Sequence, residues 1–190
     1  MKYLVMLSLV VLVLTGCTSK YKADRAVGSA APRLTKNQAS LYVSVPEDGS
    51  YAGAGGAGSG AATAKAIVTA FVPYTSRAEC GTAREGRDAA MSSAAAGGFS
   101  HYIEPTIMNW EDRATEWSGR RDAISVRLIV FDMASRQPID TVVIHGSSKW
   151  ATFGGDHPQD LLPEPMSRYA AECFGAVAVK SQPTSGRVKP

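Results

Sequence analysis

The strongest structural signal in this chain of 190 residues is a segment of alternating hydrophobic residues at positions 123–131. Alternation with period two is typical of a β-strand that buries one of its two faces. The hydrophobic residues of that face are Ile124, Val126, Leu128 and Val130. A polar loop follows, and a second hydrophobic segment at 139–145 completes a predicted β-hairpin, whose hydrophobic face needs a covering layer.

The other periodic segments of the chain alternate between strand and helix. Strands are predicted at 40–45, weakly at 76–82, and at 99–108. Helices are predicted from Ser59 to Pro73, at 88–96 and at 163–174. The order is βαβαβ, then the hairpin, then a C-terminal helix. It predicts an α/β fold with a single domain, in which a mixed sheet carries its helices mainly on one face.

The first seventeen residues form a targeting signal rather than part of the fold. The hydrophobic run at 4–14 would rise about 16 Å as a helix, which is too short to span a bilayer. Such a run after a basic start is typical of a secretory signal peptide. It ends in Leu14-Thr15-Gly16-Cys17, which matches the lipobox of bacterial lipoprotein precursors at all four positions. The sequence therefore predicts removal of residues 1–16 and acylation of Cys17.

A lipidated Cys17 also sets the location of the protein. Thr18 rather than Asp follows the cysteine, and resemblance to bacterial lipoproteins in general then implies the outer membrane, with the domain facing the periplasm. The lipid anchor makes the membrane a partner. We expect a lipidated, flexible tether at 17–38, a globular domain at 39–178 and a disordered tail at 179–190.

Composition and compartment exclude several classes of ligand. Twenty Lys and Arg against 17 Asp and Glu give a net charge of +3. Loss of Lys2 with the signal peptide leaves 19 − 17 = +2, with no basic cluster. No nucleic-acid partner is therefore expected. Cytosolic ATP and NAD are not ligands of a periplasmic domain, and no cofactor is expected.

Two cysteines, Cys80 and Cys173, remain beside Cys17. Because the periplasm is oxidising, the two are a candidate disulfide. The alternative is two buried free thiols, since Cys is among the most buried residue types. The sequence leaves both interpretations open.

Residues 53–58 match the pattern G-x-G-x-x-G between a predicted strand and a predicted helix. A dinucleotide site needs its first glycine directly after the strand, whereas residues 46–52 separate Val45 from Gly53. No Gly-Lys-Ser/Thr follows, which excludes a P-loop. We interpret the segment as a loop before a helix.

Two tryptophan-rich segments, at 109–119 and 148–158, are the most distinctive part of the sequence and lie next to predicted strand ends. Their candidate site residues are Trp110, Glu111, Asp112, Arg113, Glu116, Trp117, Trp150, Asp156 and His157. Aromatic and Arg residues on exposed loops are typical of protein contact surfaces. The preferred interpretation is a partner-contact surface or an ordered structural loop.

Two kinds of chemistry are the alternatives for these segments. A glycan- or cell-wall-binding protein or hydrolase would pair Glu111 or Glu116 with Asp156, while the tryptophans hold a sugar ring. A metal site would need His145 and His157 to converge on the acidic residues of the two segments. Neither set has diagnostic spacing, so no catalytic residue and no metal ligand is predicted.

The stretches SLYVSVPEDGSY, GSGAATA, WEDRATEWSG and WATFGGDHPQDLLPEP follow the lipobox in this order. In them the chain resembles an uncharacterised family of proteobacterial lipoproteins, a domain of unknown function, over residues 40–174. The glycine expansion at 53–58 departs from that family. The resemblance implies a lipid-anchored envelope protein and transfers no catalytic residue.

A looser resemblance is based on the predicted order of elements. The order is similar to that of the amino-terminal domain of the periplasmic protein TolB and of outer-membrane lipoproteins that form rings in export. A resemblance of fold does not fix function. We expect a non-enzymatic module that binds an envelope protein or forms a homo-oligomer.

Overall fold

The computed structural model describes residues 20–25, 32, 34–51, 54–112, 122–148 and 157–176. The predicted signal peptide, Cys17 and the predicted tail at 179–190 lie outside the described residues. Among the helices of the described ranges, none combines the length and the hydrophobicity needed to cross a membrane.

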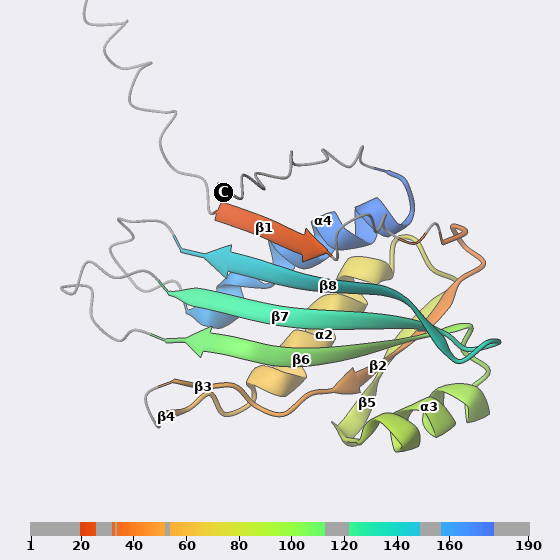
Figure 1. The fold of residues 1–190 in the computed structure, drawn as a ribbon, viewed down its shortest axis with the longest axis horizontal. Coiled ribbons are helices and arrows are strands. Elements are labelled where there is room, and N and C mark those ends of the chain that lie inside the picture. Colours follow the sequence, from red (N-terminus) through yellow and green to blue (C-terminus); the bar gives the residue numbers. More distant parts are fainter. Residues whose placement is uncertain are drawn as a thin grey trace, which may run out of the picture.

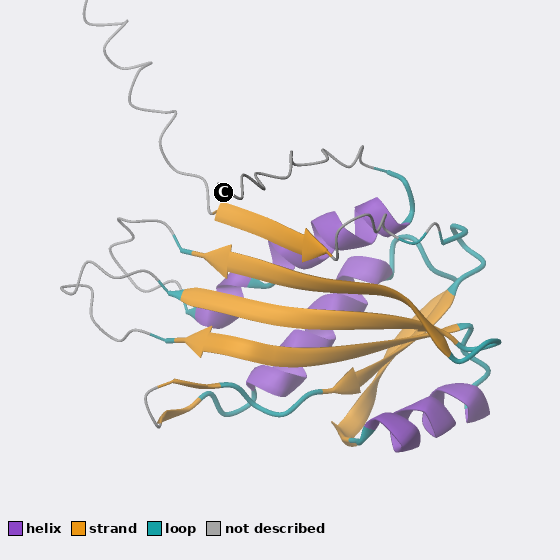
Figure 2. Ribbon diagram, in the orientation of Figure 1, coloured by secondary structure: helices purple, strands orange, loops and turns teal. Residues whose placement is uncertain are grey.

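A six-stranded mixed sheet is the centre of the fold (Figures 1 and 2). Its strands are β1 (Lys20–Arg25), β2 (Ser40–Val45), β5 (Arg77–Arg84), β6 (His101–Glu111), β7 (Ala123–Asp132) and β8 (Gln137–Ser147). Their order in the sheet is β1-β8-β7-β6-β2-β5. Strand β2 runs parallel to β5 and β6, and the other neighbours are antiparallel. A separate small ribbon consists of β3 (Ser50–Tyr51) and β4 (Ala54–Gly55).

Helices cover the two faces of the sheet unequally (Figure 2). Helices α2 (Ser59–Phe71) and α4 (Pro163–Cys173), with the short 3₁₀ helix η2 (Pro158–Leu161), pack on one face. Helix α3 (Arg87–Ala96) packs on the other face, near β2 and β6. The predicted single α/β domain, with a mixed sheet and helices mainly on one face, is confirmed.

The alternation of strand residues explains why there are two cores. Leu41 and Val43 of β2 lie in the larger core with α2 and α4, whereas Tyr42 between them lies in the smaller core beside α3. The predicted inward residues of β7 are all buried in the larger core, and they are Ile124, Val126, Leu128 and Val130. Side chains on opposite faces of one strand thus hold helices on opposite sides of the sheet.

Strand β1 lies inside the segment that was expected to be a flexible tether. It pairs antiparallel with β8, from Lys20 opposite Ser147 to Arg25 opposite Val142, and forms one edge of the sheet. Every second residue from Tyr21 to Arg25 is partly buried. The structure therefore corrects the predicted tether, since backbone pairing with β8 orders a segment too polar and too short to show a hydrophobic period.

Residues 34–38 also lie against the domain. The Leu34 N–H donates to the Cys173 carbonyl oxygen at 2.9 Å, and the Asn37 N–H donates to that of Tyr74 at 2.8 Å. The described parts of 17–38 therefore belong to the folded unit, which begins before the predicted boundary at residue 39.

Candidate functional site

The described parts of the two tryptophan-rich segments meet at one end of the sheet, where β6 and β8 end and β7 begins (Figure 1). Cross-strand pairs there join Glu111 to Ala123 and Ala123 to Ser147. Just beyond, His157 Nδ1 lies 3.8 Å from Asp112 Oδ1, and both side chains are exposed. The fold thus brings the flanks of the two segments together.

Some of the predicted site residues can be placed and others cannot. Trp110, Glu111, Asp112 and His157 are described, and the Glu111 carboxylate accepts a hydrogen bond from Asn109 Nδ2 at 3.2 Å. The candidates that lie outside the described residues are Arg113, Glu116, Trp117, Trp150 and Asp156.

Trp110 is a core residue rather than part of a contact surface. It is 3% exposed and belongs to the larger core. The backbone of two glycines packs against its side chain: a Cβ added at Gly49 would lie 2.5 Å from Trp110 Cβ, and one at Gly56 would lie 2.9 Å from Trp110 Cδ1. Of the two interpretations left open for this segment, burial excludes Trp110 from a contact surface, and close packing on the indole explains why these positions are glycine.

The two histidines of the hypothetical metal site have different neighbours. On β8, His145 Nδ1 lies 2.8 Å from Ser125 Oγ, and its Nε2 lies 3.4 Å from Asp24 Oδ2. His157 faces Asp112 instead. In the part of the chain that the structure describes, no three His, Cys, Asp or Glu side chains are grouped so that they could hold a metal ion.

A carboxylate of the chain itself occupies the N-terminus of α2. Asp48 accepts hydrogen bonds from the N–H groups of Gly60 at 2.7 Å and Gly58 at 3.0 Å, and from the Ser59 hydroxyl at 3.4 Å. In a dinucleotide-binding fold such helix N-terminal donors would face a phosphate. The two backbone donors lower the pKa of Asp48 below its usual value. Asp48 thus occupies the donors that would otherwise face a phosphate. The interpretation of 53–58 as a loop is corrected in part, because Ala54 and Gly55 form β4.

We expect Asp48→Ala to lower the free energy of unfolding at pH 7 by about 1 kcal/mol, the usual effect of losing a helix cap. Because the folded-state pKa of Asp48 is lowered, its stabilisation is fully present above the ordinary carboxyl pKa of about 4. The stabilisation is lost as the pH falls through the lowered value. Urea denaturation across a pH series should therefore show the difference between wild type and variant shrinking below about pH 4.

The neighbouring residue gives the control for the Asp48 experiment. Glu47 forms an exposed ion pair with Arg84 at 2.9 Å, so Glu47→Ala should change stability by less than about 1 kcal/mol. A difference between wild type and Asp48→Ala that is constant with pH would contradict the capping role.

Cys80 and Cys173 are free thiols in different parts of the fold. Cys80 is exposed on β5 at one edge of the sheet, whereas Cys173 is buried on α4, which contacts β1 and β8 at the other edge. The structure therefore contradicts the candidate disulfide. It also differs from the alternative of two buried thiols, because only Cys173 is buried.

We expect a maleimide to modify Cys80 in the native protein and Cys173 only after denaturation. Burial raises the pKa of Cys173 to about 12, so its sulfur stays protonated as well as shielded. Mass spectrometry of labelled peptides measures both sites. Cys80→Ser should abolish labelling of the native domain, whereas Cys173→Ser should leave it unchanged; equal labelling of both residues in the native protein would contradict the structure.

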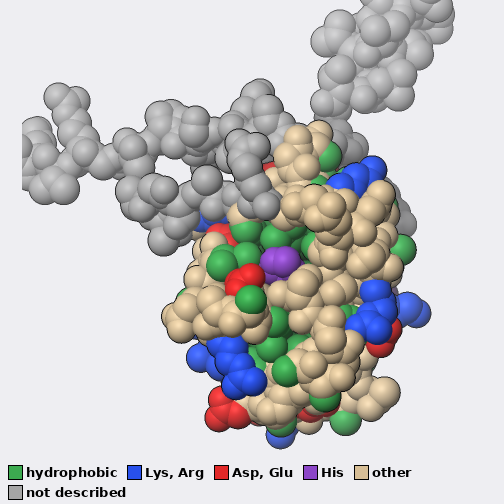
Figure 3. All heavy atoms as spheres, turned by 90° about the vertical axis from the view of Figure 1, so that its right-hand side faces the viewer, with side chains coloured by type: hydrophobic (Ala, Val, Ile, Leu, Met, Phe, Trp, Pro, Cys, Tyr) green, Lys and Arg blue, Asp and Glu red, His purple; other side chains and the backbone are tan. Residues whose placement is uncertain are grey.

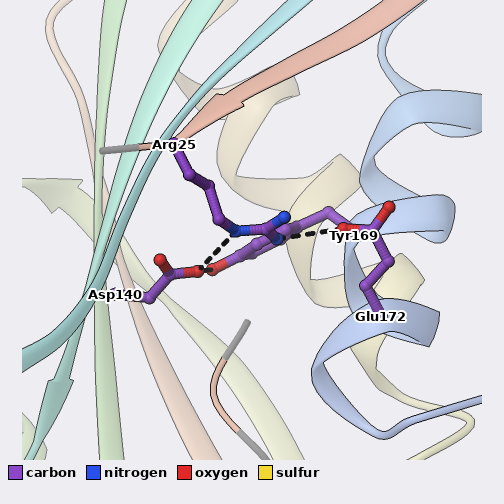
Figure 4. Close-up of polar contacts among 4 residues, drawn as sticks. All are labelled: Arg25, Asp140, Tyr169 and Glu172. Carbon is purple, nitrogen blue, oxygen red and sulfur yellow. Dashed lines mark hydrogen bonds and ion pairs between the residues drawn. The ribbon is translucent and has the colours of Figure 1, made fainter. Parts of the chain in front are cut away.

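A buried charged cluster that sequence analysis missed joins β1, β8 and α4 (Figure 4). Arg25 Nε lies 3.4 Å from Asp140 Oδ2, and Arg25 Nη2 donates to Glu172 Oε2 at 3.0 Å. The Tyr169 hydroxyl donates to the same Asp140 oxygen at 2.8 Å. The Asp140 side chain is 0% exposed, and those of Arg25 and Glu172 are 11% and 12% exposed.

Burial and charge act in opposite directions on the pKa of Arg25 but in the same direction on the pKa of Tyr169. Burial lowers the pKa of Arg25, but the hydrogen bond to Glu172 and the negative charges of Asp140 and Glu172 outweigh it and raise that pKa overall. Burial, with smaller contributions from Cys173 and Asp140, raises the pKa of Tyr169 well above its usual value. Arg25 thus stays cationic and Tyr169 stays a donor, so the cluster is suited to hold β1 against α4 rather than to transfer protons.

The charged side chains on the end of the molecule viewed in Figure 3 form no continuous surface of one sign. Lys and Arg stand in separate groups beside Asp and Glu, with hydrophobic side chains between them (Figure 3). A basic stripe of the kind that binds nucleic acid is therefore not present on this face.

Comparisons with known proteins identify a family and a shared fold. The family model described as domain of unknown function DUF4823 matches residues 32–173. Among solved structures, the PelC dodecamer from Paraburkholderia phytofirmans matches with a TM-score of 0.53 at 8% identity, over 83% of this chain and 98% of that chain. The hypothetical protein CT253 from Chlamydia trachomatis matches with a TM-score of 0.50 at 12% identity, over 73% of this chain and 99% of that chain.

One further solved structure matches more weakly than PelC and CT253. TolB from Acinetobacter baumannii matches with a TM-score of 0.38 at 10% identity, over 85% of this chain and 31% of that chain. No curated protein matched the chain. At such low identities, the likeness to PelC and CT253 shows a common fold alone.

Proposed function

The chain belongs to the family described as domain of unknown function DUF4823, and we propose that it is an outer-membrane lipoprotein whose periplasmic domain binds or assembles rather than catalyses. The expectation of an uncharacterised family is thereby confirmed. The proposal names Cys17 as the acylated residue and the membrane as a partner through its lipid.

The position of Cys17 is the observation that carries the proposal. This cysteine ends the lipobox that begins at Leu14, and it stands 20 − 17 = 3 residues before the first residue of β1. A folded domain therefore starts almost directly after the residue that would be acylated. Two or more acyl chains on one residue give stable anchoring.

Binding or assembly is favoured over catalysis by the surroundings of Trp110. A glycan hydrolase would use tryptophans to hold a sugar ring, but Trp110 is buried in the core. PelC, which shares the fold, is a dodecamer. We therefore propose that this chain acts as a homo-oligomer, with an envelope protein as the alternative partner.

Mass spectrometry of the native protein tests the anchor. We expect an N-terminal peptide that begins at Cys17 with a diacylglyceryl thioether, and a protein that stays with outer membranes when they are washed in buffer. Cys17→Ser should lose the lipid and keep residues 1–16, whereas the conservative Thr18→Ser should change neither property. A native protein without fatty acid would overturn the proposal.

Light scattering of the lipidated protein in detergent tests assembly. We expect a protein mass several times that of one chain, which is 20.0 kDa with its signal peptide. A single-chain mass at all concentrations would exclude self-assembly. Crosslinking in intact cells would then decide whether an envelope protein is the partner instead.

A further inference from the structure

The short chain between the anchor and the first strand limits which part of the domain can meet the membrane; this inference rests on the proposed acylation of Cys17. Only Thr18 and Ser19 separate Cys17 from Lys20, the first residue of β1. Three residues span at most about 11 Å when fully extended. The N-terminal end of β1 must then lie within that distance of a cysteine held at the bilayer surface.

Strand β1 is fixed to the domain, so it cannot readily lengthen this connection. All six of its residues are paired with β8. Near its start the Arg168 guanidinium lies 4.9 Å from the centre of the Tyr21 ring, and at its end Arg25 binds Asp140 and Glu172. Detaching β1 would leave the buried Asp140 without its cation, which is strongly unfavourable.

The register of the strands identifies the end of the sheet that is held near the lipid. Lys20 lies opposite Ser147, Ser147 opposite Ala123, and Ala123 opposite Glu111. We propose that this end, defined by these four residues, is the membrane-facing end and lies against the phospholipid headgroups of the bilayer that holds the anchor. The exposed pair Asp112 and His157 lies at the same end.

The turn between β7 and β8 lies at the opposite end of the sheet. Strand β8 has 11 residues, which corresponds to about 36 Å at 3.3 Å per residue. If the sheet stands on its membrane-facing end, the turn points into the periplasm, and the face in Figure 3 remains available to other molecules.

Fluorescence quenching in vesicles tests this orientation. The probe is the full lipidated protein with Cys80→Ser, in vesicles of phosphatidylethanolamine and phosphatidylglycerol that contain a nitroxide-headgroup lipid. One fluorophore is attached through Gln159→Cys, on η2 near the membrane-facing end, and another through Ala134→Cys, in the β7–β8 turn; both positions are exposed. We expect most of the fluorescence to be lost at residue 159 and none at residue 134.

A linker variant provides the matched control. Ten Gly-Ser residues inserted between Thr18 and Ser19 add roughly 17 Å of root-mean-square reach, and should remove most of the quenching at residue 159 without releasing the protein from vesicles. Equal quenching at both positions in protein that floats with the vesicles would overturn the orientation and leave the anchor intact. Protein that does not float would overturn the anchor and the orientation with it.

Discussion

Trp110→Ala should lower the free energy of unfolding by about 3–5 kcal/mol, the range for removing a large aromatic side chain from a core. The indole is almost fully buried and packs against the backbone of Gly49 and Gly56. Its removal would therefore leave a cavity lined by rigid backbone, which relaxes poorly. Urea denaturation gives the free energy, and the slope of the transition shows whether it remains two-state.

The same strand offers the control for this substitution. Met108 is 58% exposed, so Met108→Ala should change stability by less than about 0.5 kcal/mol. Gly49→Ala tests the same packing by adding an atom at the glycine. Its new Cβ would lie 2.5 Å from Trp110 Cβ, so this substitution should also destabilise the domain. A Trp110→Ala variant as stable as Met108→Ala would mean that Trp110 belongs to a surface after all.

The position of Trp110 shows where the alternation of residues along a strand fails to predict which face a side chain lies on. In β6, Ile103 and Ile107 face the larger core, and strict alternation would place Trp110 on the opposite face. A register shift between Ile107 and Asn109 inserts one residue. Such a bulge turns every later side chain to the other face. Pro105 in this strand indicates an edge position or a bulge but does not fix where the register shifts, and an aromatic residue in a polar stretch therefore suggests an exposed loop.

The parts of the fold that follow a regular period were predictable. The alternating segment at 123–131 became β7, and its inward residues are buried. The helical spacing of Met166, Tyr169 and Cys173 also places all three in the larger core. In both elements each side chain's environment depends on neighbours along the same element, so the local sequence is sufficient.

The parts that depend on distant partners were not predictable in the same way. Arg25 and Asp140 are 115 residues apart in the chain, and β1 is ordered by a strand near the other end of the sequence. One signal was available: Asp140 shares the inward face of β8 with Val142 and Ile144. A carboxylate on a hydrophobic face needs a partner, but the sequence does not say which residue supplies it.

Arg25→Ala should lower the free energy of unfolding by about 3 kcal/mol, because it leaves the fully buried Asp140 without its cation. Lys22 on the same strand gives the matched control, since its ion pair with Asp24 is exposed; Lys22→Ala should change stability by less than about 1 kcal/mol. Urea denaturation measures both variants. Equal effects of the two substitutions would show that the cluster adds nothing beyond a surface ion pair.

The double variant Arg25→Met with Asp140→Asn separates the loss of a partner from the loss of a side chain. It removes both charges of the buried pair and retains an oxygen that can accept from Tyr169, so it should be more stable than Arg25→Ala.

The buried charged cluster also limits how far the domain can lie from the acylated Cys17, because it holds β1 against the domain. If β1 detaches, the next residue with a described contact to the domain is Leu34, 34 − 17 = 17 residues from Cys17, which is up to about 60 Å of chain. Arg25→Ala in the lipidated protein should therefore reduce the quenching at residue 159, whereas Lys22→Ala should preserve it.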